Sequence, residues 1–301
     1  MTDVELYNLQ PVLHLMGVGL ALAALPLGWL AWRQRHAAPS RRLKALTVLT
    51  LFLTFDLVLF GSFTRLTDSG LGCPDWPGCY GSASPVGAQV HITAAQTAMP
   101  TGPVTHSKAW VEMIHRYLAT GVGVLILTLA AMTWWQRLRQ ATSAVSPWWP
   151  TLTLVWVCLQ GAFGALTVTM KLFPVIVTLH LMLGMGLLAL LVVQAVRYDG
   201  WQSRLVTSSL RKGLWLAFVL LWVQIALGGW VSTNYAVLAC PDFPTCHGQW
   251  VPEMNVQGFA LWRELGLAAD GQILPFAALS AIHFVHRSAA WVVLAVLVAV
   301  G

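Results

Sequence analysis

Long apolar segments separated by short polar ones dominate this chain of 301 residues. A helix that crosses a bilayer takes about 20 apolar residues, and seven segments reach that length. The pattern predicts helices at 11–32, 45–64, 110–135, 148–169, 174–196, 213–233 and 276–301. The sequence therefore predicts an all-α fold built from seven membrane-spanning helices.

The composition supports a membrane protein. Hydrophobic residues make up 57% of the chain and charged residues only 9%, whereas soluble domains carry roughly 25% charged residues. The net charge of +6 does not indicate a nucleic-acid partner, because the basic residues lie in short loops between the spans. The sequence therefore predicts an integral membrane protein with no nucleic-acid function.

The distribution of Lys and Arg predicts the orientation of the spans. The loops 33–44, 136–147 and 197–212 hold most of the 17 basic residues. These are Arg33, Arg35, Arg41, Arg42, Lys44, Arg137, Arg139, Arg197, Arg204, Arg211 and Lys212. Basic loops stay on the cytoplasmic side, so we expect the long loops 65–109 and 234–275 on the outer side.

Each long loop contains a cysteine pair with the same spacing: Cys73 with Cys79, and Cys240 with Cys246. The compartment outside the membrane permits disulfides. Zinc is the alternative, but two cysteines in a loop leave few obvious further ligands. We therefore expect one disulfide within each loop.

The cysteine loops are part of an internal repeat. The same number of residues separates a glycine from the first cysteine in both copies, and each loop leads into a helix with a His-Arg pair. The matching positions are Gly61 and Gly228, Cys73 and Cys240, His115 and His286, and Arg116 and Arg287. The repeat predicts two pseudo-symmetric four-helix transmembrane units.

From the repeat, we expect the second unit to be incomplete in this sequence. The predicted regions are an extra N-terminal helix with a basic loop at 1–44, a first four-helix unit at 45–197, and a second unit at 198–301. The second unit stops after its second helix. We expect the complete chain to continue with two more spans.

Three histidines are candidate ligands of the iron in a porphyrin. His115 and His180 are expected at similar depth on two helices of one bundle, and bundle cores hold such cofactors. His286 recurs at the place that matches His115. The alternative is that each is a hydrogen-bonded core histidine.

A carboxylate lies one helical turn before His115. Glu112 and His115 share a helix face, and an acid in a span usually marks a site. The second copy has His283 at the matching place. This difference predicts one reactive site, which contains Glu112, and one electron-transfer site.

Four other charged residues lie at or within the spans. Arg65, Arg116 and Arg287 are expected near the outer helix ends, where they could pair with anionic haem propionates or extend to the membrane interface. Asp56 lies within a span. It could serve a proton path or form a hydrogen bond to a neighbouring helix.

The motifs together resemble the haem A synthase family. The resemblance rests on the segment from Gly61 through Cys73-Pro-Asp-Trp-Pro-Gly-Cys79, on Glu112-Met-Ile-His115-Arg116, on Leu159-Gln-Gly-Ala-Phe-Gly-Ala165, and on Thr178-Leu-His180. It extends over most of the chain from about 45 onward, and the order of the motifs matches. The extra first helix departs from the family pattern.

The resemblance implies a membrane oxidoreductase that converts haem O to haem A. It would oxidise the C8 ring methyl to a formyl group by successive hydroxylations, with water as the oxygen source. Glu112, His115 and His180 would belong to the substrate-haem half, and His286 would ligate haem b. The second haem b ligand would lie on a helix beyond Gly301.

The resemblance also implies partners and a location. Haem O would come from haem O synthase, electrons would leave to a membrane acceptor, and haem A would serve cytochrome oxidase assembly. A homo-oligomer is compatible with this function. We expect a multi-pass protein of the bacterial inner membrane with its cysteine loops on the outer side.

Two other classes of protein account for only part of the sequence pattern. A dihaem cytochrome b-type electron carrier explains the histidines, but it does not explain Glu112 or the paired cysteine loops. A repeat-built transporter would have broken helices at mid-membrane, whereas the polar groups here gather near the outer helix ends.

Overall fold

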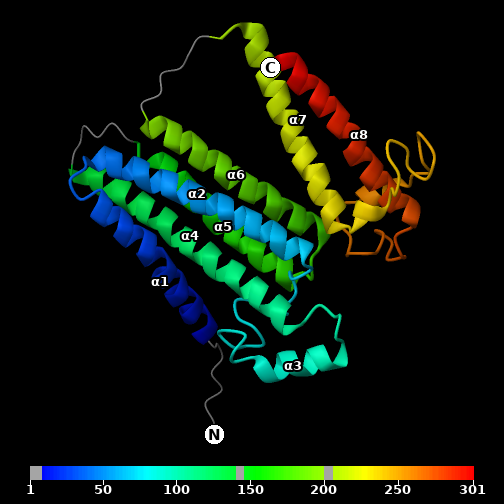
Figure 1. Ribbon diagram of the computed structural model, residues 1–301, viewed down its shortest axis with the longest axis horizontal. Helices are drawn as coiled ribbons and strands as arrows, with labels where there is room; N and C mark the ends of the chain where they lie inside the picture. Colours follow the sequence, from blue (N-terminus) through cyan, green and yellow to red (C-terminus); the bar gives the residue numbers. More distant parts are fainter. Residues whose placement is uncertain (1–8, 140–145, 200–205) are drawn as a thin grey trace. The chain divides into compact units, whose positions relative to one another are not determined.

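The computed structural model describes residues 9–139, 146–199 and 206–301. In order, the helices are α1 (Gln10–Arg33), α2 (Pro39–Leu66), α3 (Gln89–Ala98), α4 (His106–Arg139), α5 (Trp148–Thr169), α6 (Pro174–Tyr198), α7 (Ser208–Thr233), the short η1 (Ala236–Leu238) and η2 (Val256–Phe259), and α8 (Phe276–Val300) (Figure 1). Within these ranges extended residues pair only in isolated bridges, so the all-α prediction is confirmed. Arg204, one of the predicted loop residues, lies outside the described residues.

The seven predicted spans are confirmed as seven long apolar helices among the described residues. The chain is an integral membrane protein. Three helices begin four or more residues earlier than predicted. Helix α7 begins at Ser208 rather than at 213, and the Thr207 hydroxyl accepts the N–H of Leu210 at 3.3 Å. Helix α4 begins at His106 rather than at 110 because the Thr105 hydroxyl accepts the N–H of Lys108 at 3.2 Å, which caps the first turn. Helix α2 begins at Pro39, since proline suits a first helical turn.

Helix α3 lies in the region that the sequence predicts only as a loop. Its ten residues, Gln89–Ala98, are too few to cross a bilayer. The helix is held by packing: Ile92 is buried beside Cys73 and Cys79, and the His91 ring stacks on Tyr80 with centroids 5.4 Å apart. The first long loop is therefore a folded cap rather than an open connection.

The chain divides into two compact units. One comprises Met1–Lys171 with Leu183–Trp201, and the other comprises Leu172–Met182 with Gln202–Gly301. Helix α6 is therefore shared, with its first turns in the second unit. These units are defined by packing contacts, whereas the repeat is defined by sequence spacing. The repeat boundaries 45–197 and 198–301 therefore stay a prediction.

The first unit is held by apolar packing and one buried polar bridge. Leu187 and Leu191 of α6 pack with Ile126 of α4 in a buried cluster. Gln194 accepts from Thr153 of α5 at 3.4 Å and donates to Thr47 of α2 at 3.1 Å, so it links three helices. Buried amides of this kind must be paired.

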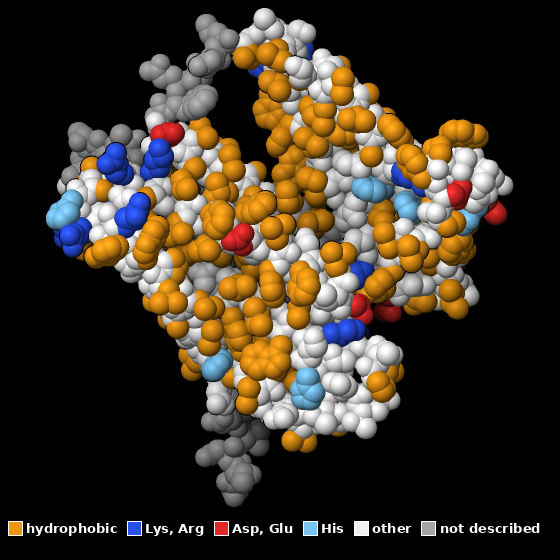
Figure 2. Space-filling view, viewed as in Figure 1, with side chains coloured by type: hydrophobic (Ala, Val, Ile, Leu, Met, Phe, Trp, Pro, Cys, Tyr) orange, Lys and Arg blue, Asp and Glu red, His pale blue; other side chains and the backbone are white. Residues whose placement is uncertain are grey.

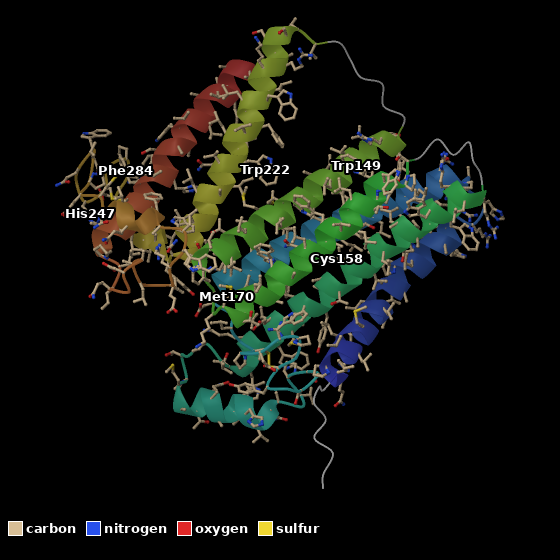
Figure 3. The ribbon with its side chains drawn as sticks, turned by 180° about the vertical axis from the view of Figure 1, so that it is seen from behind. Trp149, Cys158, Met170, Trp222, His247 and Phe284 are labelled. Carbon is tan, nitrogen blue, oxygen red and sulfur yellow. A yellow bond between two sulfur atoms is a disulfide. The ribbon has the colours of Figure 1, made fainter. Side chains whose placement is uncertain are left out.

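Charge is segregated on the surface of this first unit. Figure 2 shows Lys and Arg gathered at the end where α1 finishes and α2 begins, while hydrophobic side chains cover the helix flanks. Arg33 lies in the last turn of α1, and Arg137 and Arg139 lie in the last turn of α4. The positive-inside prediction requires basic residues to gather at the helix ends opposite the cysteine loops, and this grouping agrees with it. Cys158, a free cysteine, is exposed on α5 (Figure 3).

The second unit pairs α7 with α8 beneath a long folded loop. Trp230, Val231 and Ile282 form its core with Ala236 and Ala239. The Trp230 indole donates to the carbonyl of Gly258 at 2.9 Å. The buried Arg263 guanidinium donates to the same carbonyl at 3.0 Å and to the side chain of Asn234. These bonds fix the loop 234–275 over the helix ends.

Candidate functional site

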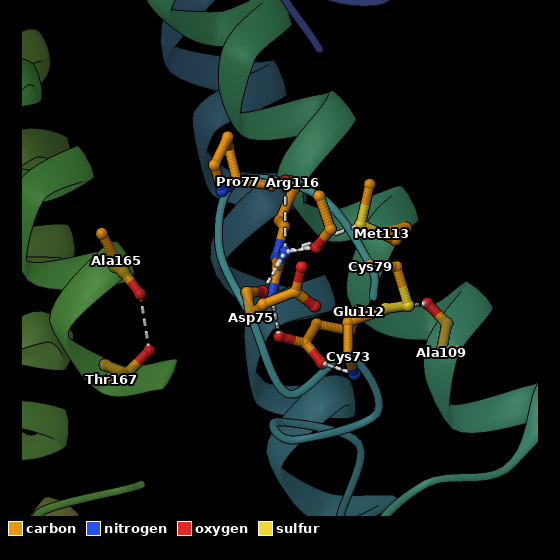
Figure 4. Close-up of polar contacts among 12 residues, drawn as sticks. Cys73, Asp75, Pro77, Cys79, Ala109, Glu112, Met113, Arg116, Ala165 and Thr167 are labelled. Carbon is orange, nitrogen blue, oxygen red and sulfur yellow. Dashed lines mark hydrogen bonds and ion pairs between the residues drawn. A yellow bond between two sulfur atoms is a disulfide. The ribbon is translucent and has the colours of Figure 1, made fainter. Parts of the chain in front are cut away.

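The first cysteine loop is closed by a disulfide and is tied to α4 by Glu112. Cys73 and Cys79 are bonded, as predicted, with their Cα atoms 4.8 Å apart. The backbone N–H of Cys73 donates to Oε2 of Glu112 at 2.7 Å (Figure 4). Glu112 is only 4% exposed. Its carboxylate is therefore a fixed, buried acceptor rather than a mobile surface group.

Arg116 binds the same loop from the next helical turn. Its guanidinium pairs with Glu112 and also donates to the carbonyls of Asp75, Pro77 and Gly78 at 3.0, 3.2 and 2.6 Å. Breaking a buried pair of this kind costs about 3–5 kcal/mol, because one charge is left uncompensated. Glu112 and Arg116 therefore hold the loop against α4 as one unit.

The loop also binds itself through an acid at its centre. The Asp75 carboxylate accepts the N–H groups of Tyr80 and Gly81 at 2.6 and 2.7 Å. Tyr80 has a φ of 50° and Gly81 a φ of 69°, so the backbone turns sharply after the disulfide. A carboxylate that accepts two adjacent N–H groups stabilises such a turn.

The second cysteine loop repeats this arrangement, with a different side chain as the acceptor for the N–H of its first cysteine. Cys240 and Cys246 are bonded, which confirms the second predicted disulfide. Arg287 donates to the carbonyls of Asp242 and Thr245, each at 2.7 Å. The N–H of Cys240 donates to Nδ1 of His283 at 3.3 Å. An imidazole therefore takes the structural place that Glu112 has in the first loop.

Asp242 is the counterpart of Asp75. Its carboxylate accepts the N–H groups of His247 and Gly248 at 2.6 and 2.9 Å; Figure 3 shows His247 in this loop. The pKa of Asp242 falls from 3.8 to about 2, mainly because the Thr245 hydroxyl donates to the carboxylate, with help from the Gly248 N–H. Donors that favour the charged form lower a pKa in this way.

Two of the three candidate haem histidines, His115 and His286, lie against a glycine of the preceding span. A Cβ placed on Gly61 of α2 would come within 3.0 Å of Nε2 of His115, and one on Gly228 of α7 within 3.1 Å of Cε1 of His286. The Phe60 ring also stacks on His115, with centroids 6.2 Å apart. The missing side chains allow both imidazoles to lie close against the neighbouring helix, at the positions that the repeat spacing already relates.

The His286 imidazole has a polar neighbour that the sequence pattern does not reveal. Nε2 of Gln224, one turn before Gly228 on α7, lies 3.1 Å from Nδ1 of His286 and 3.3 Å from its carbonyl oxygen. A single glutamine in an apolar span carries no motif. Only the equal spacing of the two copies could have drawn attention to this stretch of α7.

The remaining predicted residues have different settings. His180 is half-buried and lies in Leu172–Met182, so it and His115 fall in different compact units; their shared haem stays a prediction. Arg65 is half-buried in the last turn of α2. Arg116 and Arg287 already serve loop carbonyls, and propionate contacts also stay a prediction. Asp56 is exposed on α2.

A bare metal ion has no obvious site in the described ranges, where no group of three or more His, Cys, Asp and Glu is arranged to hold one. A haem iron differs, because its porphyrin supplies the equatorial ligands and the protein adds only axial ones. The imidazoles of His115 and His286, each beside a glycine, fit that requirement.

The fold and the site define a class: all-helical membrane proteins in which disulfide-closed loops are clamped onto histidine-bearing helices. A family model described as cytochrome oxidase assembly protein (COX15-CtaA) matches residues 44–301. The chain belongs to this family.

Similar proteins carry a common name. Haem A synthase of Shewanella oneidensis is 37% identical over 243 residues, which cover 79% of this chain and 72% of the relative. Haem A synthase of Rhizorhabdus wittichii is 28% identical over 279 residues, covering 85% and 77%. The enzyme of that name from Halalkalibacterium halodurans is 26% identical over 221 residues, covering 71% and 67%.

Proposed function

We propose that this chain is a haem A synthase, which oxidises the C8 methyl of haem O to a formyl group and supplies haem A for cytochrome oxidase assembly. The observation that carries the proposal is the buried Glu112, fixed one turn from His115 beneath a disulfide-closed loop. The family membership and the relatives named haem A synthase support the same function.

The first four-helix repeat, 45–197, holds the reactive residues in this proposal. His115 and His180 are the proposed ligands of the substrate-haem iron. The absence of a side chain at Gly61 lets the His115 imidazole lie close against α2. Replacing a methyl hydrogen by a hydroxyl group from water releases electrons and protons. Glu112 lies on α4 one turn before His115, and its carboxylate can accept such a proton. Its bonds to the Cys73 N–H and to Arg116 fix its position.

The second unit has the electron-transfer role. His286 would hold haem b, and when bound that group supplies reversible one-electron transfer. His283 cannot replace Glu112 as an anionic base, although it accepts the equivalent loop N–H. The electrons would pass to a membrane acceptor. We place the cysteine loops on the outer side of a bacterial inner membrane, because the basic residues gather at the opposite ends of the helices.

Separate variants in the two halves test this division of labour. Glu112→Gln keeps a side-chain oxygen for the Cys73 N–H but removes the ionisable group. We expect it to lower haem A formation by about 100-fold or more while bound haem remains. His115→Ala should loosen the substrate haem, and His286→Ala should remove haem b. Pyridine haemochrome spectra and haem chromatography of the full-length variants give both readouts.

The dihaem electron carrier remains the alternative function. It predicts that Glu112→Gln leaves every haem signal unchanged and that no variant alters a haem product. Near wild-type haem A formation by Glu112→Gln would remove the catalytic assignment of Glu112.

A further inference from the structure

The contact between Gln224 and His286 joins two side chains from adjacent spans of the second unit. Gln224 lies on α7 and His286 on α8, and the amide nitrogen approaches the imidazole Nδ1 at 3.1 Å. The amide oxygen of Gln224 is buried and has no hydrogen-bond partner among the described residues. A buried carbonyl oxygen without a donor is uncommon and costs stability.

The chemistry of an iron-bound imidazole supplies the missing donor. A neutral histidine that ligates iron through Nε2 carries its proton on Nδ1, and the other ring N–H of a ligating histidine is nearly always donated to an acceptor. The oxygen and nitrogen of a carboxamide are nearly equal in size. A half-turn of the Gln224 amide therefore brings its unpartnered oxygen to Nδ1. The turn gives up the 3.3 Å hydrogen bond from the amide nitrogen to the carbonyl oxygen of His286 in exchange for the bond from Nδ1–H.

We propose that Gln224 is the positioning residue of the haem b half. It accepts the Nδ1–H of His286, holds the imidazole in the tautomer that leaves Nε2 for the iron, and fixes the ring beside Gly228. This inference rests on the proposed function, because it takes His286 to be the haem b ligand. It adds a residue outside the motifs that carry the resemblance.

The position of Gln224 on α7 explains how this one residue can orient the His286 imidazole. Gln224 precedes Gly228 by one turn, so both lie on the same face of α7. Gly228 would bring a Cβ within 3.1 Å of Cε1 of His286. The glycine allows the ring to approach the helix, and the amide then defines its rotation. At the matching position of α2, the first copy of the repeat has Leu57, which has no hydrogen-bonding group.

A potentiometric titration of haem b in the full-length protein tests the proposal. A stronger acceptor on Nδ1–H makes the imidazole a better electron donor and favours ferric iron, so Gln224→Glu should lower the midpoint potential. Gln224→Leu removes the acceptor and should raise it. Loss of such an outer partner typically weakens binding of the metal group 10- to 100-fold, so transfer of haem b from Gln224→Leu to apomyoglobin should be about 10- to 100-fold faster.

Gln194→Leu is the matched control. Gln194 is also a buried, hydrogen-bonded amide in a span, but it bonds Thr47 and Thr153 in the first unit. It should leave the haem b potential unchanged. Opposite shifts for Glu and Leu at 224 distinguish positioning from packing, which would move both variants in one direction.

The outcomes separate the inference from the proposed function. If the wild type makes haem A but neither Gln224 variant changes the potential or the haem transfer rate, the inference is wrong and the function stands. If the potentials shift in opposite directions but the wild type makes no haem A, the function is wrong and Gln224 keeps its role. A wild-type protein that binds no haem through His286 would overturn the inference together with the haem b assignment.

Discussion

Glu112 and His283 show how one structural task is met by two different side chains. Both accept the backbone N–H of the first cysteine in their loop, at 2.7 and 3.3 Å. The sequence comparison of the two copies predicts only a chemical difference at this position. The structure adds a shared function, because each residue also holds a disulfide loop. Any variant of Glu112 therefore changes both the loop and the chemistry.

A reciprocal exchange separates these two tasks. Glu112→His should keep the acceptor for Cys73, as His283 does for Cys240, so we expect a folded, haem-loaded protein that makes no haem A. His283→Glu should place a carboxylate four residues before Arg287, in the spacing of the Glu112–Arg116 pair, and should retain haem b. Haem chromatography and haem content measure both. Substantial haem A from Glu112→His would show that holding the loop is the whole role of Glu112.

Asp242 gives the second loop a defined dependence on pH. Its pKa is about 2 in the folded protein and 3.8 in the reference state. A lowered pKa stabilises the fold above pH 3.8, and this contribution is lost as the pH falls towards 2. We expect the loop to stay ordered at pH 5 and to loosen near pH 2.

Hydrogen exchange of the His247 and Gly248 amides, corrected for intrinsic rates, measures this change. Asp242→Asn should already show low protection at pH 5, because the charged acceptor is gone, and it should show little further change on acidification. Equal protection in the wild type at pH 5 and pH 2 would contradict this account of the loop.

At the scale of helices, hydrophobic length was sufficient to predict every span. The seven helices were predicted correctly because each requires only a long apolar run. The first turns of α2, α4 and α7 were not, since Pro39, Thr105 and Thr207 begin these helices within polar sequence. Helix α3 was missed because its ten residues are stabilised by contacts with the cysteine loop. The disulfides followed from compartment and spacing, whereas Gln224 became visible only when α7 and α8 were placed together.

The close contacts of Gly61 and Gly228 with histidines of neighbouring helices should be needed for haem binding. Gly61→Ala places a methyl group about 3 Å from His115, and Gly228→Ala does the same at His286, so we expect each to lower haem content in its own half. Gly123→Ala is the control, because nothing lies within 4 Å of the added carbon. In a helix that change should be neutral or stabilising by up to about 1 kcal/mol.

Haem content and thermal unfolding of the purified variants decide this prediction. Full haem occupancy in both Gly61→Ala and Gly228→Ala would mean that the space beside the histidines is not needed for binding. A loss confined to Gly123→Ala would have the same meaning.

Considered as a whole molecule, the chain uses one loop design twice. Each copy has a disulfide, a central aspartate that accepts two loop amides, and an arginine that binds loop carbonyls. The repeat was predicted from spacing alone. The hydrogen bonds that make the copies equivalent could not be, because Asp75 and Asp242 act through the folded backbone. The two copies then differ at Glu112 and His283, and at Leu57 and Gln224, which is where the proposed functions diverge.

The most direct test is haem A formation by the full-length protein in a host that makes haem O but has no haem A synthase of its own. Chromatography of extracted haems should show haem A when the wild-type gene is expressed and only haem O with an empty vector. If the protein accumulates with its haem bound and haem O remains the sole product, the account is contradicted and the electron-carrier function is favoured.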